Sequence, residues 1–172
     1  MQLHLRLLLF ATLLLNTVFL TDCGKKGGTK RIEQVTPSSE PKFQKEGVLT
    51  FFDEMDTLKT IDIEIADNNN ERGLGMMYRT SMDYGKGMLF IMEYEEPQSF
   101  WMKNCKMSLD IMYVNADYEI VSLYKHTLPY SDTNIPSIKP ALFVVETSAG
   151  FCDKFGIVVG NTIQFMRDRQ PV

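Results

Sequence analysis

The stretch that decides the fold is LKTIDIEIA, residues 58–66, in which Ile61, Ile63 and Ile65 alternate with polar residues. Successive side chains of an extended chain point to opposite faces, so the three isoleucines share one face. The acidic residues between them share the other. This alternation predicts a β-strand with one face in the core and one face toward solvent.

Shorter apolar runs on either side of this strand predict more strands. They lie at residues 48–52, 88–92, 99–102, 109–114, 119–125, 141–147 and 162–166. We expect short helices only at 71–79, after capping residues at 67–70, and at 148–155, where Ser148 would be the cap. The three prolines within 126–140 indicate a long ordered loop. The sequence therefore predicts a mainly β (α+β) fold: a compact, closed or nearly closed antiparallel β domain with one or two short helices.

Composition limits the class of protein. The chain has 172 residues, of which 44% are hydrophobic and 23% charged, which fits one packed domain with extra segments and excludes a disordered protein. Three cysteines, Cys23, Cys105 and Cys152, are too few for a disulfide scaffold. Cys105 and Cys152 could pair in an oxidising compartment, but two buried free thiols are the expectation.

The N-terminal segment has the pattern of a secretion signal. Residues 7–20, LLLFATLLLNTVFL, are long enough for a signal-peptide core and short for a membrane span. The run ends at Leu20-Thr21-Asp22-Cys23, which resembles the lipobox of bacterial lipoproteins, although Asp22 stands where a small residue is usual. The resemblance implies removal of residues 1–22 and attachment of lipid chains such as palmitate to Cys23. An uncleaved signal anchor with an inert Cys23 is the alternative.

The chain after Cys23 divides by composition and charge. Residues 23–46 are rich in Lys, Gly, Ser and Pro and predict a flexible tether, with six basic and three acidic residues at 24–46, a net charge of +3. Residues 47–172 carry 11 basic and 18 acidic residues, a net charge of −7, and form the predicted domain. An acidic domain argues against nucleic acid as a partner. We expect a protein held in the bacterial cell envelope by membrane lipid, facing the periplasm and sorted to the outer membrane.

An ordered series of motifs runs through the predicted domain. They include GMMYR at 75–79, GMLF at 87–90, FWMKN at 100–104, LDI at 109–111 and VVE at 144–146. In this order they resemble the domain-of-unknown-function 192 family. The resemblance implies a mainly β, secreted or lipid-anchored domain, and it brings no established reaction; a sugar-binding-like role rests on fold analogy alone. Cys105 stands where the family usually has Thr.

Five residues form the candidate binding site: Trp101, Lys103, Asn104, Asp110 and Arg79. An aromatic face with Lys and Asn nearby could stack on and hydrogen-bond a sugar-like or other small polar ligand. Asp110 lies inside an apolar strand, and a buried carboxylate needs a partner, for which Arg79 or Arg72 is the natural choice. The alternative is that Trp101 packs in the core and Asp110 forms a purely structural ion pair.

Function is expected to be recognition of a small ligand or of an envelope protein, without catalysis. One alternative is a hydrolase that uses Asp110 and Glu146 as a carboxylate pair. Another is a purely structural or assembly role. No cofactor and no metal are expected: His126 is a lone histidine in the domain, and the many methionines, which could bind Cu(I), fit core packing better.

Overall fold

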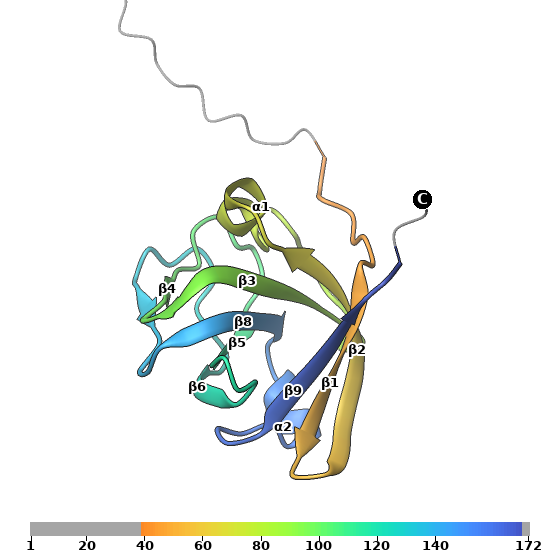
Figure 1. The fold of residues 1–172 in the computed structure, drawn as a ribbon. Coiled ribbons are helices and arrows are strands. Elements are labelled where there is room, and N and C mark those ends of the chain that lie inside the picture. Colours follow the sequence, from red (N-terminus) through yellow and green to blue (C-terminus); the bar gives the residue numbers. More distant parts are fainter. Residues whose placement is uncertain (1–38, 170–172) are drawn as a thin grey trace, which may run out of the picture. The chain divides into compact units, whose positions relative to one another are not determined.

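The computed structural model describes residues 39–169, drawn in colour in Figure 1. The predicted signal peptide, Cys23 and most of the predicted tether lie outside the described residues. In chain order the elements are β1 (Gly47–Asp53), β2 (Asp56–Ala66), α1 (Asn69–Leu74), β3 (Lys86–Glu96), β4 (Ser99–Phe100), β5 (Leu109–Val114), β6 (Ile120–Tyr124), β7 (Ile135–Pro136), β8 (Ala141–Ser148), α2 (Phe151–Phe155) and β9 (Thr162–Arg167). The prediction of a mainly β fold with two short helices is confirmed.

Seven strands form one large sheet, in the order β6-β5-β8-β3-β2-β1-β9. All neighbours pair antiparallel except β2 and β3, which are parallel and are connected through α1. The sheet does not close into a barrel. An isolated bridge between Glu119 and Thr162 joins its two ends at one corner. Among residues 39–169, no helix is long and apolar enough to cross a bilayer.

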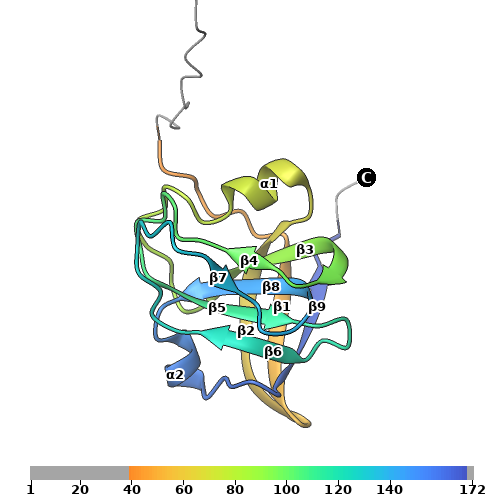
Figure 2. The same cartoon turned by 90° about the vertical axis from the view of Figure 1, so that its left-hand side faces the viewer.

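Apolar side chains pack on both faces of the middle of the sheet. On one face, α2 covers a core that includes Ile61, Leu89 and Met112. On the other face, the small β4-β7 sheet lies over β3, β8 and β5 in Figure 2. There Phe100 of β4 contacts the ring of Phe90 edge-on, with 5.0 Å between centroids. Because β5 and β8 have both faces covered, their sequences read as apolar runs rather than as a clean alternation.

The three isoleucines of β2 are buried as predicted, but the opposite face is only partly open to solvent: Asp62 is half-buried and Glu64 is buried. The helix predicted at 71–79 is wrong in length, because α1 ends at Leu74. Gly75 follows with φ of 45°, a conformation that side chains with a Cβ rarely adopt, and so stops the helix. The cap at its start is confirmed: the Asn68 side chain accepts from the backbone N–H groups of Asn70 and Glu71.

The second helix also differs from its prediction. It begins after Gly150, which has φ of 85° and no side-chain cap, so Ser148 is not its cap. Ser148 belongs to β8, and its hydroxyl donates to the carbonyl of Met82. The loop predicted at 126–140 contains the short strand β7.

Residues just before β1 contact the domain. The Glu40 carboxylate accepts from the Thr80 backbone N–H at 2.7 Å, and the Glu46 carboxylate accepts from the Ile65 N–H at 2.7 Å. The Gln44 N–H donates to Glu64 at 2.7 Å. The described chain is thus hydrogen-bonded to the sheet from Glu40 onward.

Candidate functional site

A cavity of about 270 Å³ lies on the face of the large sheet that β4 and β7 cover. Segments from four places in the sequence line it: α1 with the loop after it, β3, the segment from Ser99 to Cys105, and β8. Its walls are rings and thioethers, from Phe90, Phe100, Trp101, Met76, Met77 and Met92. We call this cavity the Glu146 pocket, after the acidic residue that lines it.

Glu146 stands on β8 between Met88 of β3 and Ile111 of β5. It is 3% exposed, and no described group donates a hydrogen bond to its carboxyl or forms an ion pair with it. Burial alone raises the pKa of Glu146 from its ordinary value of 4.5 to about 8. The carboxyl is therefore mostly protonated at neutral pH. It is a polar group in an apolar pocket without a partner among residues 39–169.

Trp101 lines the pocket and is 46% exposed. The Lys103 ammonium lies over its ring, 4.9 Å from the centroid. Asn104 has φ of 57°, and its side-chain amide donates to the Tyr78 hydroxyl at 3.2 Å, while its carbonyl accepts from the Tyr78 N–H at 2.9 Å. Asn104 thus fixes the loop of Trp101 against the loop that follows α1. The indole ring is held at the pocket with part of its surface facing water.

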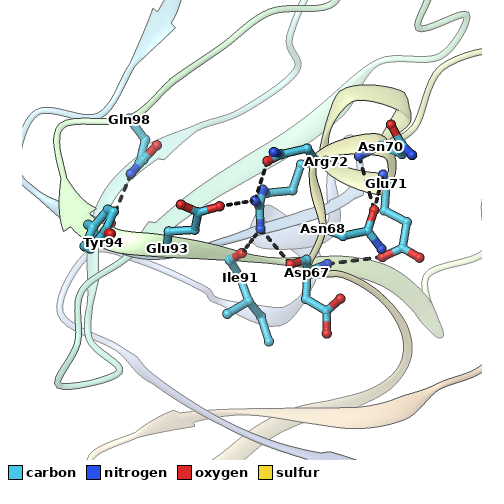
Figure 3. A network of polar contacts seen from close by, with 10 residues as sticks. Asp67, Asn68, Asn70, Glu71, Arg72, Ile91, Glu93, Tyr94 and Gln98 are labelled. Atoms are coloured by element: carbon cyan, nitrogen blue, oxygen red, sulfur yellow. Dashed lines mark hydrogen bonds and ion pairs between the residues drawn. The ribbon is translucent and has the colours of Figure 1, made fainter.

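Arg72 also lines the pocket, but its guanidinium is bound elsewhere (Figure 3). Nη1 donates to the carbonyls of Asp67 at 2.8 Å and Ile91 at 2.9 Å. Nη2 donates to the side chains of Asn69 at 2.7 Å and Glu93 at 3.1 Å. These bonds tie α1 to β3. They use four of the five N–H donors of the guanidinium, so this cation serves the frame of the pocket.

The predicted ion pair between Asp110 and Arg79 is wrong, and so is the alternative with Arg72. The Asp110 carboxylate is fully buried and accepts two backbone N–H groups, from His126 and Cys152, each at 2.9 Å. Two such bonds satisfy a buried carboxylate without a cation. The Arg79 guanidinium instead lies 2.7 Å from the Glu64 carboxylate, and both side chains are about nine-tenths buried.

The predicted hydrolytic pair of Asp110 and Glu146 is also wrong. In the β5–β8 ladder Asp110 is opposite Thr147, whereas Glu146 is opposite Ile111. Residues opposite each other share a face and the next pair takes the other face, so the two carboxyls lie on opposite sides of the sheet. They cannot act on one substrate.

The two cysteines of the domain are free and buried, and they belong to different cores. Cys105 lines the Glu146 pocket, and burial, with a smaller effect from Glu146, raises the pKa of its thiol to about 12. Burial, with a smaller effect from Asp110, raises the pKa of Cys152 as well. Both sulfurs are therefore in the unreactive thiol form at neutral pH.

Of the five residues predicted for the site, only Trp101 lines the pocket. Lys103 lies over the Trp101 ring, and Asn104 bonds to Tyr78 without lining the cavity. Arg79 and Asp110 lie in separate structural contacts. Sequence reasoning considered Glu146 only as a catalytic partner, and it missed the role of Phe90, Phe100 and the methionines as pocket walls. One signal could have found the pocket: Glu146 is the only acidic residue in the apolar run of β8.

Comparison with known proteins supports the family resemblance. The profile of the DUF192 family, described as an uncharacterised ACR, matches residues 50–165, a range that includes Trp101 and Glu146. A protein of Sinorhizobium meliloti, proposed to be a transcription regulator, is 29% identical; the match covers 74% of this chain and 98% of that one, with a TM-score of 0.67. A protein of unknown function from Novosphingobium aromaticivorans is 28% identical over 80% of this chain and 99% of that one, also with a TM-score of 0.67. No curated protein matches the chain.

Proposed function

The chain belongs to the DUF192 family, and we propose that its domain is a binding module that takes a small ligand into the Glu146 pocket and catalyses no reaction. The observation that carries the proposal is the Glu146 carboxyl, which is 3% exposed and has no partner among the described residues. Most buried carboxyls in proteins have a protein hydrogen-bond partner, whereas this one lies at the wall of an open, largely apolar pocket. A ligand that supplies the missing partner accounts for this arrangement.

Burial of the Glu146 carboxyl has an energetic cost that a ligand can offset. A polar group sealed from water without a hydrogen bond destabilises a fold by about 1–3 kcal/mol, which is the upper limit for Glu146, because its oxygens are not among the sealed, unpaired atoms of residues 39–169. A ligand that bonds to the carboxyl recovers that free energy, and its apolar part gains by leaving water for the rings and thioethers of the pocket. The preferred ligand therefore has an apolar body and one hydrogen-bonding group.

A sugar-like ligand is the second chemical class to consider. The partly exposed ring of Trp101 supports it, because such a ring can stack on the face of a pyranose. The pocket interior supports it less, because Glu146 is the one carboxyl among its lining residues and the Arg72 guanidinium is already bonded. A sugar would bind with most of its hydroxyls at the mouth of the pocket, in water.

We further propose that the domain is displayed in the bacterial cell envelope by lipid chains on Cys23. The support comes from the signal-like run at 7–20 and from the cysteine that follows it. Lipid chains hold a protein at a membrane by burying methylene groups, at about 0.8 kcal/mol each. The basic residues of 24–46 would lie near anionic headgroups. Residues 47–172 carry a net charge of −7, which disfavours nucleic acid as a partner.

The test uses Trp101, which is the only tryptophan in the chain. Its fluorescence reports directly on the mouth of the pocket. The full-length protein is titrated with a panel of monosaccharides and small amphipathic molecules, and thermal unfolding of the same mixtures gives an independent readout. We expect a saturable change in emission together with a raised Tm. If no member of the panel gives a saturable change in emission or raises the Tm, the structural or assembly role is favoured instead.

A further inference from the structure

The chemistry of the Glu146 pocket narrows the class of ligand. Resting on the proposed function, we infer that the pocket takes a small organic cation, an amine with an apolar or aromatic body, and that Glu146 releases its proton to solvent when the ammonium group binds. Neither the family nor the fold assigns such a ligand. Charge, wall chemistry and size each contribute to the inference.

The first step is the balance of charge in the pocket. Cys105, Tyr113 on β5 and Arg72 on α1 are the titratable and charged groups nearest to Glu146. The ion pair of Glu64 on β2 with Arg79 lies on the same face of the sheet, beyond Met88, and the Lys103 ammonium lies over the Trp101 ring. The thiol and the phenol are neutral, since burial, with a smaller effect from Glu146, raises the pKa of each. The Arg72 guanidinium is bonded to two backbone carbonyls and to Glu93. Arg79 is held by Glu64, and Lys103 lies over Trp101. No cation among residues 39–169 therefore forms an ion pair with Glu146, and a positively charged ligand would do so.

The second step concerns the walls. Phe90, Phe100 and Trp101 bring three aromatic rings to the cavity. The face of an aromatic ring carries a partial negative potential and attracts cations within about 6 Å. Lys103 already uses Trp101 in this way, with its ammonium 4.9 Å from the ring centroid. Thioethers are polarisable and pack well against the apolar part of a ligand. An anion would find the Ser99 hydroxyl and the protonated Glu146 carboxyl as donors, but the one cation among the lining side chains, Arg72, is already bonded elsewhere.

The third step is size. A cavity of about 270 Å³ has room for roughly nine water molecules at their liquid volume of about 30 Å³ each. It is at the small end of known ligand pockets. A ligand of about nine to twelve non-hydrogen atoms fits inside, whereas a nucleotide or a peptide would have to leave most of its atoms outside the open pocket. Small arylalkyl amines have this size.

The proton balance of the step is simple. Before binding, the carboxyl holds a proton in most molecules at neutral pH, because its pKa is near 8. The amine arrives as an ammonium and keeps its proton. The carboxyl proton passes to solvent, and a carboxylate–ammonium pair remains in the pocket. As the pH is raised toward the pKa of Glu146, the affinity for the amine should increase about tenfold per pH unit. Above that pKa the affinity should level off.

The experiment compares three probes of nearly equal size on the full-length protein: phenethylammonium, phenethyl alcohol and phenylacetate. Trp101 emission gives the affinities. Calorimetry in two buffers of different ionisation enthalpy gives the number of protons released. We expect phenethylammonium to bind at least about tenfold more tightly than the alcohol at mildly alkaline pH, and phenylacetate to bind most weakly. Near neutral pH, binding of the amine should release about one proton.

Two substitutions separate the role of the carboxyl from general effects. Glu146→Gln keeps the shape of the side chain and removes its charge, so it should abolish the preference for the amine and the proton release, while the alcohol binds as before. Glu54→Gln makes the same change at an exposed residue of the β1–β2 turn, which does not line the pocket, and should change nothing.

The outcomes distinguish this inference from the proposed function. If the alcohol binds as tightly as the amine and Glu146→Gln has no effect, the cation is excluded while a small-ligand pocket stands. If none of the three probes binds, the inference is overturned. The sugar and amphiphile panel then decides the proposed function on its own.

Discussion

Glu146→Gln should stabilise the protein, and increasingly so as the pH rises. In the folded protein the pKa of Glu146 is about 8, whereas in the unfolded chain it returns to about 4.5. Between these values the folded state binds more protons than the unfolded state, so the carboxyl lowers the free energy of unfolding as the pH increases. Below about pH 4.5 it has no such effect. Above about pH 8 the loss is complete and constant.

The two pKa values set the magnitude. One pKa unit corresponds to about 1.4 kcal/mol, so the 3.5-unit difference between 8 and 4.5 gives a full loss of about 5 kcal/mol. At about pH 7 the wild-type carboxyl should cost about 3 kcal/mol, and at about pH 5 about 1 kcal/mol. Glutamine does not titrate. The difference in stability between variant and wild type should therefore grow by about 2 kcal/mol over this range.

Chemical denaturation of both proteins at a series of pH values measures this difference. Other groups that titrate in the same range cancel, because both proteins share them. Glu54→Gln, at an exposed position, serves as the matched control and should show no trend with pH. A stability difference that stays flat from about pH 5 to pH 8, or a variant less stable than wild type at neutral pH, would refute the assignment of Glu146 as an unpartnered buried acid.

Two further contacts of the structure and the proposed lipid anchor each give a prediction. Asp110→Asn should lower stability by about 2 kcal/mol, because the amide cannot accept from both N–H groups, and labelling of the Cys152 thiol should become faster; an unchanged Tm would contradict the role of this carboxylate. Arg79→Met or Glu64→Gln alone should cost about 3–5 kcal/mol in the free energy of unfolding, because each leaves a buried group of the ion pair without its partner. Replacing both by apolar residues should recover most of that loss in denaturation curves, and additive losses would disprove their coupling. Cys23→Ser should remove incorporation of labelled palmitate and move the protein from the membrane to the soluble fraction of cells; a labelled or membrane-bound variant would count against the lipid anchor.

Much of the fold follows from sequence patterns that depend on local geometry. The alternation of 58–66 predicted β2, and the apolar runs at 109–114 and 141–147 predicted β5 and β8 nearly to the residue. The first helix was predicted too long, since apolar and polar spacing alone does not show that Gly75 takes a positive φ. The order of the strands in the sheet, including the parallel β2–β3 pair, was not predicted, because it depends on contacts between segments that are distant in the sequence.

The site was predicted less well than the fold, for a physical reason. Sequence indicates that Asp110 and Glu146 are both acids within buried strands. Which face each one takes depends on the β5–β8 register, and whether it finds a donor depends on what covers that face. Two backbone N–H groups bond to Asp110, whereas rings and thioethers surround Glu146. The first acid is thereby structural, and the second is available to a ligand.

The corner bridge between Glu119 and Thr162 bears on self-association. A long sheet with two free edges offers backbone donors and acceptors on which a second chain can add a strand, which is a route to aggregation. The sheet curves so that its two outermost strands, β6 and β9, meet at one corner. There the N–H of Ile120 donates to the carbonyl of Asn161 at 2.8 Å. Backbone groups at this corner are thus occupied from within the chain, so strand addition there would first have to break native bonds.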